Sequence, residues 1–203
     1  ARRRVFRSRF RGSRRVSRRR RRRPDRPDHR LPGRPGPVVI DVAKDVFDAK
    51  VDYAYPETVH LRGYSGRYPG SEAEIDAVVE AVAEARRPLL FVGGGVIGAD
   101  QAEAVRSIVT QLGAPVTSTL LGLGAVAADA EGFLGFAGMH GSYAANMAIQ
   151  GCDLLLCIGM RFSDRVTGIV SGFAPKARVV HFEIDEAEVN KNVRADYHVA
   201  GDL

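Results

Sequence analysis

From residue 88 onward, short and almost continuous apolar runs alternate with segments in which apolar residues return every three or four positions. The continuous runs are typical of strands that are covered on both faces of a parallel sheet. They predict strands at residues 88–92, 114–120, 153–159 and 177–185. The spaced apolar positions predict helices at residues 101–112, 142–150 and 186–193. This alternation predicts an α/β fold with a doubly wound, mostly parallel sheet and helices on both of its faces.

A helix with a clear start precedes these elements. Ser71 followed by Glu74 is a capping-box pattern, and it predicts a helix from Ser71 to about Ala85. The apolar face of this helix is expected to consist of Ile75, Val78, Val79 and Val82.

The segment before this helix has a different character. Residues 38–42 predict a short strand, and the Tyr-, Pro- and Gly-rich residues 52–70 predict an extended connection. We therefore expect a linker with a first strand at 34–70 and a folded domain at 71–203. The sequence stops at Asp202–Leu203, where a further helix would be expected, so the domain is predicted to be truncated at its C-terminus.

Charge divides the chain unevenly. Residues 1–33 hold 16 arginines and two aspartates, whereas residues 34–203 hold 14 basic and 22 acidic side chains. The sequence pI of about 9.7 is therefore a property of the first 33 residues. Such a segment repels itself and has little apolar surface to bury, so an Arg-rich, disordered N-terminal tail is predicted.

Three explanations of the tail stay open, and a targeting segment is the minor one. Clustered arginines can bind nucleic acid through its phosphates, although no nucleic-acid-binding motif accompanies them. Arginine is also over-produced when a GC-rich gene is translated out of frame, and this is the explanation that we favour. Nucleic acid is accordingly not expected to be the main partner.

The cysteines and the apolar runs of the sequence exclude several classes of protein. Cys152 and Cys157 have neither metal-site spacing nor a disulfide framework, and are expected to be buried small side chains in a reducing, cytoplasmic setting. No apolar run approaches the roughly 20 residues that span a bilayer, so no membrane partner is expected. No secretory signal follows the basic N-terminus.

A glycine turn is predicted at residues 93–100, between a strand and a helix. Gly93, Gly95 and Gly98 match the pattern G-x-G-x-x-G, whose glycines let backbone N–H groups approach a phosphate. The nicotinamide version also needs an acidic residue about 20 positions later, where this chain offers Thr119. A conventional NAD site is therefore not expected, while a turn without any ligand stays open.

Unusual loops follow four of the predicted strands, among them the Gly-rich loop at 121–141. In a doubly wound sheet the carboxyl ends of the strands share one edge, so these loops should converge on one crevice. Arg161 would then meet a phosphate, and Glu183 would accept a hydrogen bond from a ribose hydroxyl. This pattern favours a dinucleotide lying along the edge.

Several long stretches together carry a family resemblance. They are RPGPVVIDVAKD, LLFVGGG, PVTSTLLGLGA, GMHGSYAANMAIQGCDLLLCIGMRFSDRVTG and VVHFEIDEAEVNKNVRADYHVAGDL. Through them, residues 34–203 closely resemble the central domain of the acetolactate synthase large subunit, within the thiamine-diphosphate enzyme superfamily. Glyoxylate carboligase, pyruvate oxidase and sulfoacetaldehyde acetyltransferase stay open as alternatives in the same superfamily.

The resemblance implies a division of labour among three domains. The parent enzyme would decarboxylate pyruvate and transfer the two-carbon unit to a second 2-oxo acid, in branched-chain amino-acid biosynthesis. Thiamine diphosphate and Mg²⁺ would be bound by the two other domains, so this chain should have no catalytic residue or metal ligand and be inactive alone. The parent would be a homo-oligomer, with or without a small regulatory subunit.

The central domain of this family binds FAD, which does no net redox work there. The FAD contacts implied by the resemblance are Arg34, Gly94, Thr119, Leu120, Gly138, Met139, His140, Gly159, Arg161, Glu183, Ile184, Gly201 and Asp202. The residues implied near the substrate channel are Lys44, Met139, Asp164 and Arg165. Arg165 would pair with the carboxylate of a 2-oxo acid, which suits guanidinium geometry.

The chain departs from the family pattern at two of these loops. Ala43 stands where a proline usually precedes Lys44, and Ser163 stands where an aspartate is frequent. Plainer roles also stay open for single residues. His140 could simply begin a helix, the Asp164–Arg165 pair could be a solvated ion pair, and His60, His181 and His198 are expected to be packing or surface residues.

Overall fold

The computed structural model describes residues 41–50, 52 and 70–203, and the chain divides into two units, Ala1–Gly66 and Arg67–Leu203. In the first unit, the described residues contain one short helix, α1 (Lys44–Phe47), with no buried residue. The strand predicted at 38–42 falls partly outside the described residues, and its last two residues, Asp41 and Val42, belong to no strand. Almost all of the predicted connection at 52–70 lies outside them as well.

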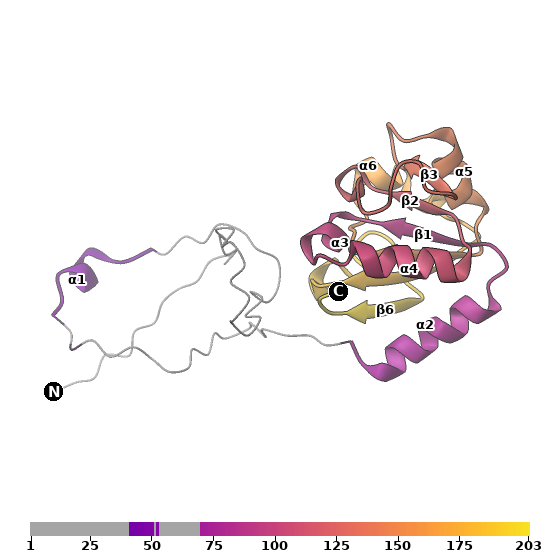
Figure 1. Cartoon of the computed structure of the whole chain (residues 1–203). Helices are drawn as coiled ribbons and strands as arrows, with labels where there is room; N and C mark the ends of the chain where they lie inside the picture. The colour runs from indigo at the N-terminus through magenta and orange to yellow at the C-terminus, as the bar shows by residue number, and fades with distance from the viewer. Residues whose placement is uncertain (1–40, 51, 53–69) are drawn as a thin grey trace. The chain divides into compact units, whose positions relative to one another are not determined.

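The second unit is built on a parallel sheet of six strands (Figure 1). The strands are β1 (Pro88–Val92), β2 (Val116–Ser118), β3 (Phe133–Phe136), β4 (Leu154–Ile158), β5 (Arg178–Glu183) and β6 (Tyr197–Ala200). Their order is β3-β2-β1-β4-β5-β6, and every neighbouring pair is parallel. The predicted α/β fold is therefore confirmed, and the carboxyl ends of all six strands lie at one edge.

The helices of this unit mostly begin and end where the sequence predicts. They are α2 (Glu72–Glu84), α3 (Gly94–Gly98), α4 (Ala102–Leu112), α5 (Tyr143–Gly151) and α6 (Asp164–Thr167), with single 3-10 turns η1 (Leu120–Gly122), η2 (Val170–Gly172) and η3 (Glu186–Glu188). The capping box is confirmed: Ser71 N donates to Glu74 Oε2 at 2.9 Å, and Glu74 N donates to Ser71 Oγ at 3.2 Å. Helix α4 ends at Gly113, as predicted.

The apolar face predicted for α2 is only partly correct. Val78 is buried, but Ile75 and Val79 are 45% and 60% exposed, and Ala81 is buried in their place. The physical reason is the position of α2, which packs against β6 at the end of the sheet. A helix on an edge strand covers one narrow stripe, so side chains that flank the stripe stay in solvent.

Other predictions fail where burial is incomplete. Strand β3 lies inside the predicted loop at 121–141, β6 was not predicted as a strand, and the turn predicted at 93–100 contains α3. Both missed strands are edge strands: β3 is only half-buried and contains Gly135, and β6 has one buried residue among its four. The helix predicted at 186–193 shrinks to η3, because the backbone is already extended at Val189 and turns left-handed at Asn190, with φ 58°.

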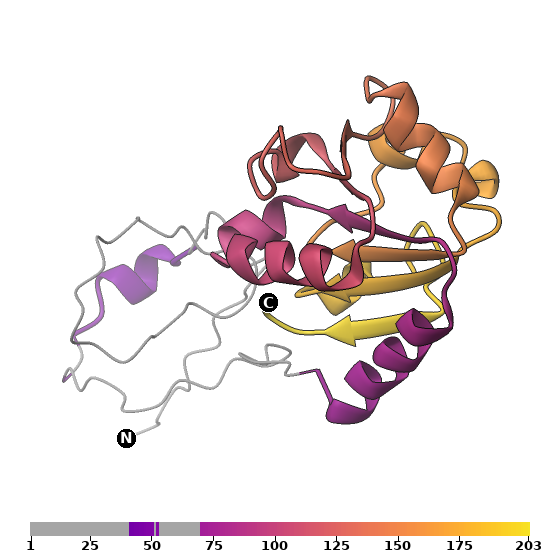
Figure 2. The same ribbon diagram turned by 45° about the vertical axis from the view of Figure 1, so that its right-hand side comes forward.

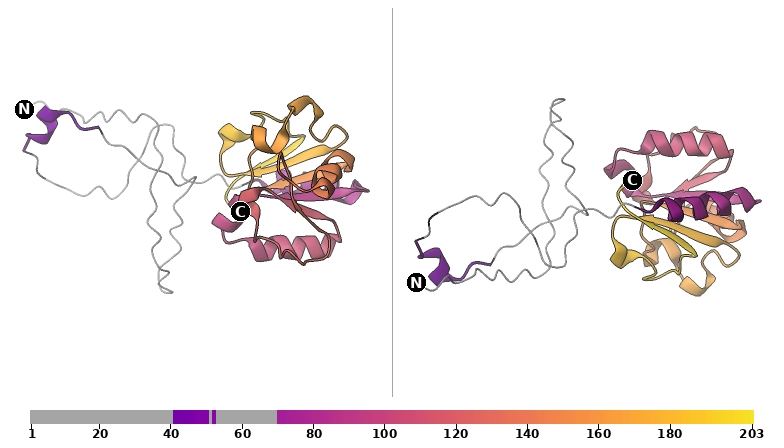
Figure 3. Two further views of the ribbon diagram at one scale, coloured as in Figure 1. Left: turned by 90° about the horizontal axis from the view of Figure 1, so that it is seen from above. Right: turned by 90° about the horizontal axis from the view of Figure 1, so that it is seen from below.

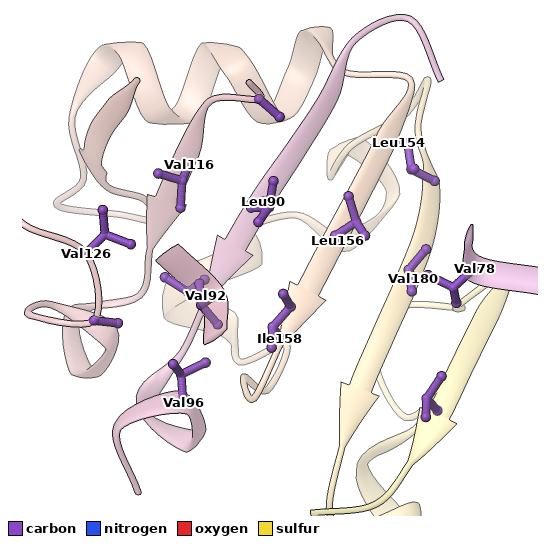
Figure 4. Close-up of a cluster of buried hydrophobic side chains, with 14 of the residues drawn as sticks. Val78, Leu90, Val92, Val96, Val116, Val126, Leu154, Leu156, Ile158 and Val180 are labelled. Atoms are coloured by element: carbon purple, nitrogen blue, oxygen red, sulfur yellow. The ribbon is translucent and has the colours of Figure 1, made fainter. Parts of the chain in front are cut away.

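The sheet is covered on both faces, as a doubly wound fold requires. Alternate residues of β1 point to opposite sides: Leu90 and Val92 join one buried cluster, and Leu89 and Phe91 join another. The first cluster packs under α2, α3 and α4 (Figure 4), and the second packs under α5. Views along the sheet show α4 and α5 on opposite sides (Figure 3). Each fully buried large side chain contributes about 1.5–3 kcal/mol.

The chain changes direction in the sheet between β1 and β4. Strands β2 and β3 extend to one side of β1, and after α5 the chain returns beside β1 and builds β4, β5 and β6 on the other side. Strand β6 forms the far edge, and the C-terminus follows directly from it (Figure 2). The point between β1 and β4 is the topological switch point, where open α/β sheets bind their ligands.

Glycine backbone fills this switch point. Gly93 N donates to Ile158 O at 2.9 Å, and Gly95 N donates to Gly159 O at 2.8 Å. Gly159 has φ +60°, and a Cβ there would lie 2.8 Å from the backbone nitrogen of Val96. Gly93, Gly95 and Gly159 therefore allow the loops after β1 and β4 to come into close contact. We call these three glycines the glycine seam.

One buried side chain of β5 is ionisable. His181 has no exposed surface, and its Nε2 lies 2.8 Å from the carbonyl oxygen of Met160. Burial lowers its pKa, although the hydrogen bond to Met160 and the charge of Glu188 act in the opposite direction and His198 acts with burial. His181 is thus buried in the core and not at the surface, and its imidazole is neutral at neutral pH.

The glycine seam yields a stability prediction. We expect Gly159→Ala to lower the free energy of unfolding by about 2–5 kcal/mol, from about 1–2 kcal/mol for a left-handed alanine and about 1–3 kcal/mol for overpacking. The matched control is Gly98→Ala, where a Cβ would meet nothing within 4 Å. Urea unfolding followed by circular dichroism measures both, and equal effects of the two substitutions would contradict the seam's role.

The lowered pKa of His181 predicts a pH dependence. Below about pH 6.5 the unfolded chain takes up a proton at His181 that the folded chain does not, so the free energy of unfolding should fall. The fall is at most about 1.4 kcal/mol per pH unit and ends below the folded-state pKa. Urea unfolding between about pH 5 and 7.5 should show a weaker dependence in His181→Gln. Parallel curves for the two proteins would refute this account.

Candidate functional site

Most of the residues singled out from the sequence lie at the carboxyl edge of the sheet. Gly94 follows β1, Thr119 follows β2, and Gly138, Met139 and His140 follow β3 in the chain. Gly159 and Arg161 follow β4, Glu183 ends β5 and Ile184 follows it, and Gly201 and Asp202 follow β6. They come together because all six strands run the same way, although up to 108 positions separate them in the sequence.

The loops after β1 and β2 are in contact. Thr119 N donates to Val92 O at 2.8 Å, and a Cβ at Gly94 would lie 3.1 Å from the Cβ of Leu121. The Thr119 hydroxyl accepts a hydrogen bond from Gly122 N at 3.1 Å and caps η1. This turn leaves Leu120 and Leu121 largely exposed beside the glycines.

The loops after β3 and β4 are also joined, through Gly138. The Asn146 side chain of α5 receives a hydrogen bond from Gly138 N at 2.9 Å and donates one to Gly138 O at 3.0 Å. Gly138 has φ +112°, and a Cβ there would lie 2.5 Å from Arg165 O. Met139 N donates to the same carbonyl at 2.9 Å. The structure therefore brings Met139 and Arg165 together.

The two arginines of the loop after β4 have different surroundings. Arg161 is exposed, and its side chain has no hydrogen bond or ion pair to the described residues. Arg165 lies in α6, where its Nε is 4.0 Å from Asp164 Oδ2 and the two side chains are 72% and 81% exposed. Such an exposed pair contributes little. Both guanidinium groups are therefore accessible to an anion.

Glu183 differs from the expectation for a ribose contact. The residue is only 3% exposed, and its Oε1 accepts a hydrogen bond from Asp185 N at 3.2 Å. Its carbonyl accepts a hydrogen bond from Gly201 N at 3.0 Å, which ties the chain end after β6 to β5. The carboxylate is covered by protein in this structure, whereas Asp202, the residue after Gly201, is exposed.

Two of the expected site residues cannot be related to this edge. Arg34 lies outside the described residues, as does His60, which was expected to be a packing or surface residue. Lys44 is the first residue of α1 in the first unit, directly after Ala43, which precedes the helix without a side-chain cap.

The two cysteines and the acidic groups do not form a metal centre. Cys152 and Cys157 are free and buried, as predicted. Burial raises the pKa of Cys152 to about 11 and raises that of Cys157 as well, so both thiols are protonated at neutral pH. Within residues 41–50, 52 and 70–203, no three His, Cys, Asp or Glu side chains gather in a way that could hold a metal ion. No helix in the same ranges could cross a membrane.

A hollow of about 660 Å³ lies at the opposite, amino-terminal edge of the sheet and contains none of the expected site residues. Its walls include Arg86, Arg87, Leu112, Ala114 and Cys152. The C-terminal ends of α2, α4 and α5 converge there. Helix C-termini carry a partial negative charge, which offsets the positive charge of the two arginines. We therefore assign the candidate site to the carboxyl edge, at the switch point.

Sequence reasoning missed the side chains that hold the edge loops. Asn146 clamps Gly138, His181 bonds the carbonyl of Met160, and Asn192 Nδ2 donates to Phe162 O at 2.6 Å. The only signal in the sequence was their presence within the long stretches of family resemblance. Their partners are backbone groups up to 30 residues away, which no local pattern reveals.

Comparison with known proteins agrees with the geometry. Residues 75–203 match the family described as "Thiamine pyrophosphate enzyme, central domain". The acetolactate synthase large subunit of Parasynechococcus marenigrum is 46% identical over 173 residues, which are 84% of this chain and 28% of that protein. A probable acetolactate synthase large subunit of Methanocaldococcus jannaschii is 45% identical (84% and 29%), and that of Corynebacterium glutamicum is 42% identical (85% and 28%).

This chain thus spans less than a third of the length of these relatives. The match covers the whole sheet, from the first turn of α2 to the end of the chain. The chain therefore belongs to the thiamine pyrophosphate enzyme family, of which it carries the central domain.

Proposed function

We propose that this chain is the FAD-binding central part of an acetolactate-synthase-like enzyme. The parent enzyme would decarboxylate pyruvate and transfer the two-carbon unit to a second 2-oxo acid. The identity of 42–46% to acetolactate synthase large subunits supports this proposal. Thiamine diphosphate and Mg²⁺ would be held by parts of the parent outside this chain, and assembly into a homo-oligomer in the cytoplasm fits such a biosynthetic enzyme.

The carboxyl edge has the chemistry that FAD needs. The glycine backbone at Gly94 and Gly159 would suit a diphosphate, because neither residue has a side chain of its own that would keep it away. The exposed apolar side chains of Leu120, Leu121 and Met139 would pack against the rings of FAD. Bound FAD would supply no net redox chemistry in this family, so the chain's contribution is to bind and orient the cofactor.

The single observation that carries the proposal is the state of Arg161. Its guanidinium is exposed at the switch point and has no partner among the described residues. An arginine beside a glycine backbone is suited to a phosphate, because its planar fork forms charge-assisted hydrogen bonds. Glu183 is a weaker candidate for a sugar contact than first expected, since its carboxylate is covered, and Asp202 is the more accessible acid.

Arg165 would face the substrate instead. Its carbonyl accepts a hydrogen bond from Met139 N, and its Nη1 lies 3.9 Å from the Met139 sulfur. These contacts direct it toward the loop after β3 rather than toward Gly159. With Asp164 as a weak neighbour, it would receive the carboxylate of a 2-oxo acid.

The two arginines provide the test. We expect Arg161→Ala to weaken FAD binding about ten- to a hundredfold, because a charge-assisted hydrogen bond contributes about 1.5–3 kcal/mol and 1.4 kcal/mol corresponds to about one decade in affinity. Arg165→Ala, the matched control, should change it less than about twofold. Flavin fluorescence titration at equal salt measures both with the 203-residue chain, whose affinity should be weak without the rest of the parent.

Riboflavin, which lacks the diphosphate, serves as the second probe. Neither substitution should change its binding. The opposite ranking of the two arginines would show that their roles are exchanged, and equal weak effects of both would contradict a diphosphate site at this edge.

A further inference from the structure

The loop that carries Arg161 is held at two carbonyls, one on each side of the arginine. His181 Nε2 lies 2.8 Å from Met160 O, and Asn192 Nδ2 lies 2.6 Å from Phe162 O. Both donors come from outside the loop: His181 from β5, and Asn192 from the segment between η3 and β6. The peptide group before Arg161 and the one after Phe162 therefore have fixed positions.

The neighbouring side chains fix the loop in the same way. Met160 and Phe162 are both buried in the second cluster, whereas Arg161 between them is exposed. The ring of Phe162 packs against the imidazole of His181 with centroids 4.8 Å apart, and against Phe173 at 5.8 Å. With its two neighbours anchored inward, the Arg161 side chain is directed outward at the carboxyl edge.

His181 has a feature that packing alone does not explain. A carbonyl oxygen can only accept a hydrogen bond, so Nε2 must carry the proton, and Nδ1 is left as an acceptor. That Nδ1 is buried without a hydrogen-bond partner among the described groups. Burying such an acceptor is unfavourable. A leucine or phenylalanine would fill the same apolar surroundings without burying an unpaired acceptor. The histidine is therefore explained by the hydrogen bond that its Nε2–H donates.

We propose that His181 and Asn192 are positioning residues, which hold the carbonyls on either side of Arg161 so that its guanidinium is pre-set to receive the diphosphate of a bound dinucleotide. The inference rests on the proposed function of Arg161. Its physical basis is preorganisation: a side chain on a fixed backbone loses less freedom when it binds than one on a loose loop.

The first experiment is a double-mutant cycle on the 203-residue chain, with FAD as the probe. His181→Leu should weaken FAD binding about three- to tenfold, the range expected for one side chain that must be ordered on binding. His181→Gln should restore most of the affinity, because the glutamine amide can donate from nearly the same position. In the Arg161→Ala background, His181→Leu should have almost no further effect.

An equal loss in both backgrounds would overturn the proposal, because His181 would then act through general stability. Asn192→Asp keeps the shape of the side chain and removes the N–H donor. A double-mutant cycle with this substitution should give the same result as the cycle with His181→Leu. Thermal unfolding of each variant identifies any that do not fold.

The second experiment does not depend on flavin. Amide hydrogen exchange should become faster over residues 159–166 in His181→Leu and Asn192→Asp and stay slow in His181→Gln, while exchange over β1 should not change. Unchanged exchange over 159–166 in both variants would overturn the positioning role whatever the FAD result. If instead Arg161→Ala leaves FAD binding unaltered while exchange responds as expected, the proposed phosphate contact fails and the positioning of the loop stands.

Discussion

The backbone contact between Gly95 and Gly159 is the constraint on which the arrangement of the site depends. It joins the loops after β1 and β4, the two neighbouring strands from which the sheet grows in opposite directions. Only residues without a side chain allow this approach, since a Cβ at either position would lie less than 3.0 Å from backbone atoms of the other loop. The same glycines that suggest a phosphate turn are therefore needed first by the fold.

Side-chain amides and one imidazole hold the remaining loops in place through hydrogen bonds to their backbone. Asn146 satisfies both polar groups of Gly138, and His181 and Asn192 satisfy the carbonyls around Arg161. Each of these bonds links a loop to a different element of the chain. The edge thus consists of rigid backbone that displays a few exposed groups, which is the arrangement that lowers the entropy lost on binding.

Electrostatics separates the two ends of the sheet. At the amino-terminal edge the C-termini of three helices meet two arginines, so opposite charges already balance there. At the carboxyl edge Arg161 has no such counterpart among the described residues, and Arg165 has only an exposed neighbour in Asp164. An exposed arginine without a side-chain partner among these residues, beside glycine backbone, favours an anionic ligand at the carboxyl edge.

The sequence by itself determined the central strands and the helices that have clear start or stop signals. The apolar runs of β1 and β4, the capping box at Ser71 and the stop at Gly113 are local signals, and each acts within a few residues. Family resemblance then added the candidate residues at the ends of the strands. Only the tertiary structure decided the edge strands β3 and β6, the covered carboxylate of Glu183 and the partners of His181 and Asn192. These depend on contacts between segments distant in the chain, and no periodicity along the sequence encodes them.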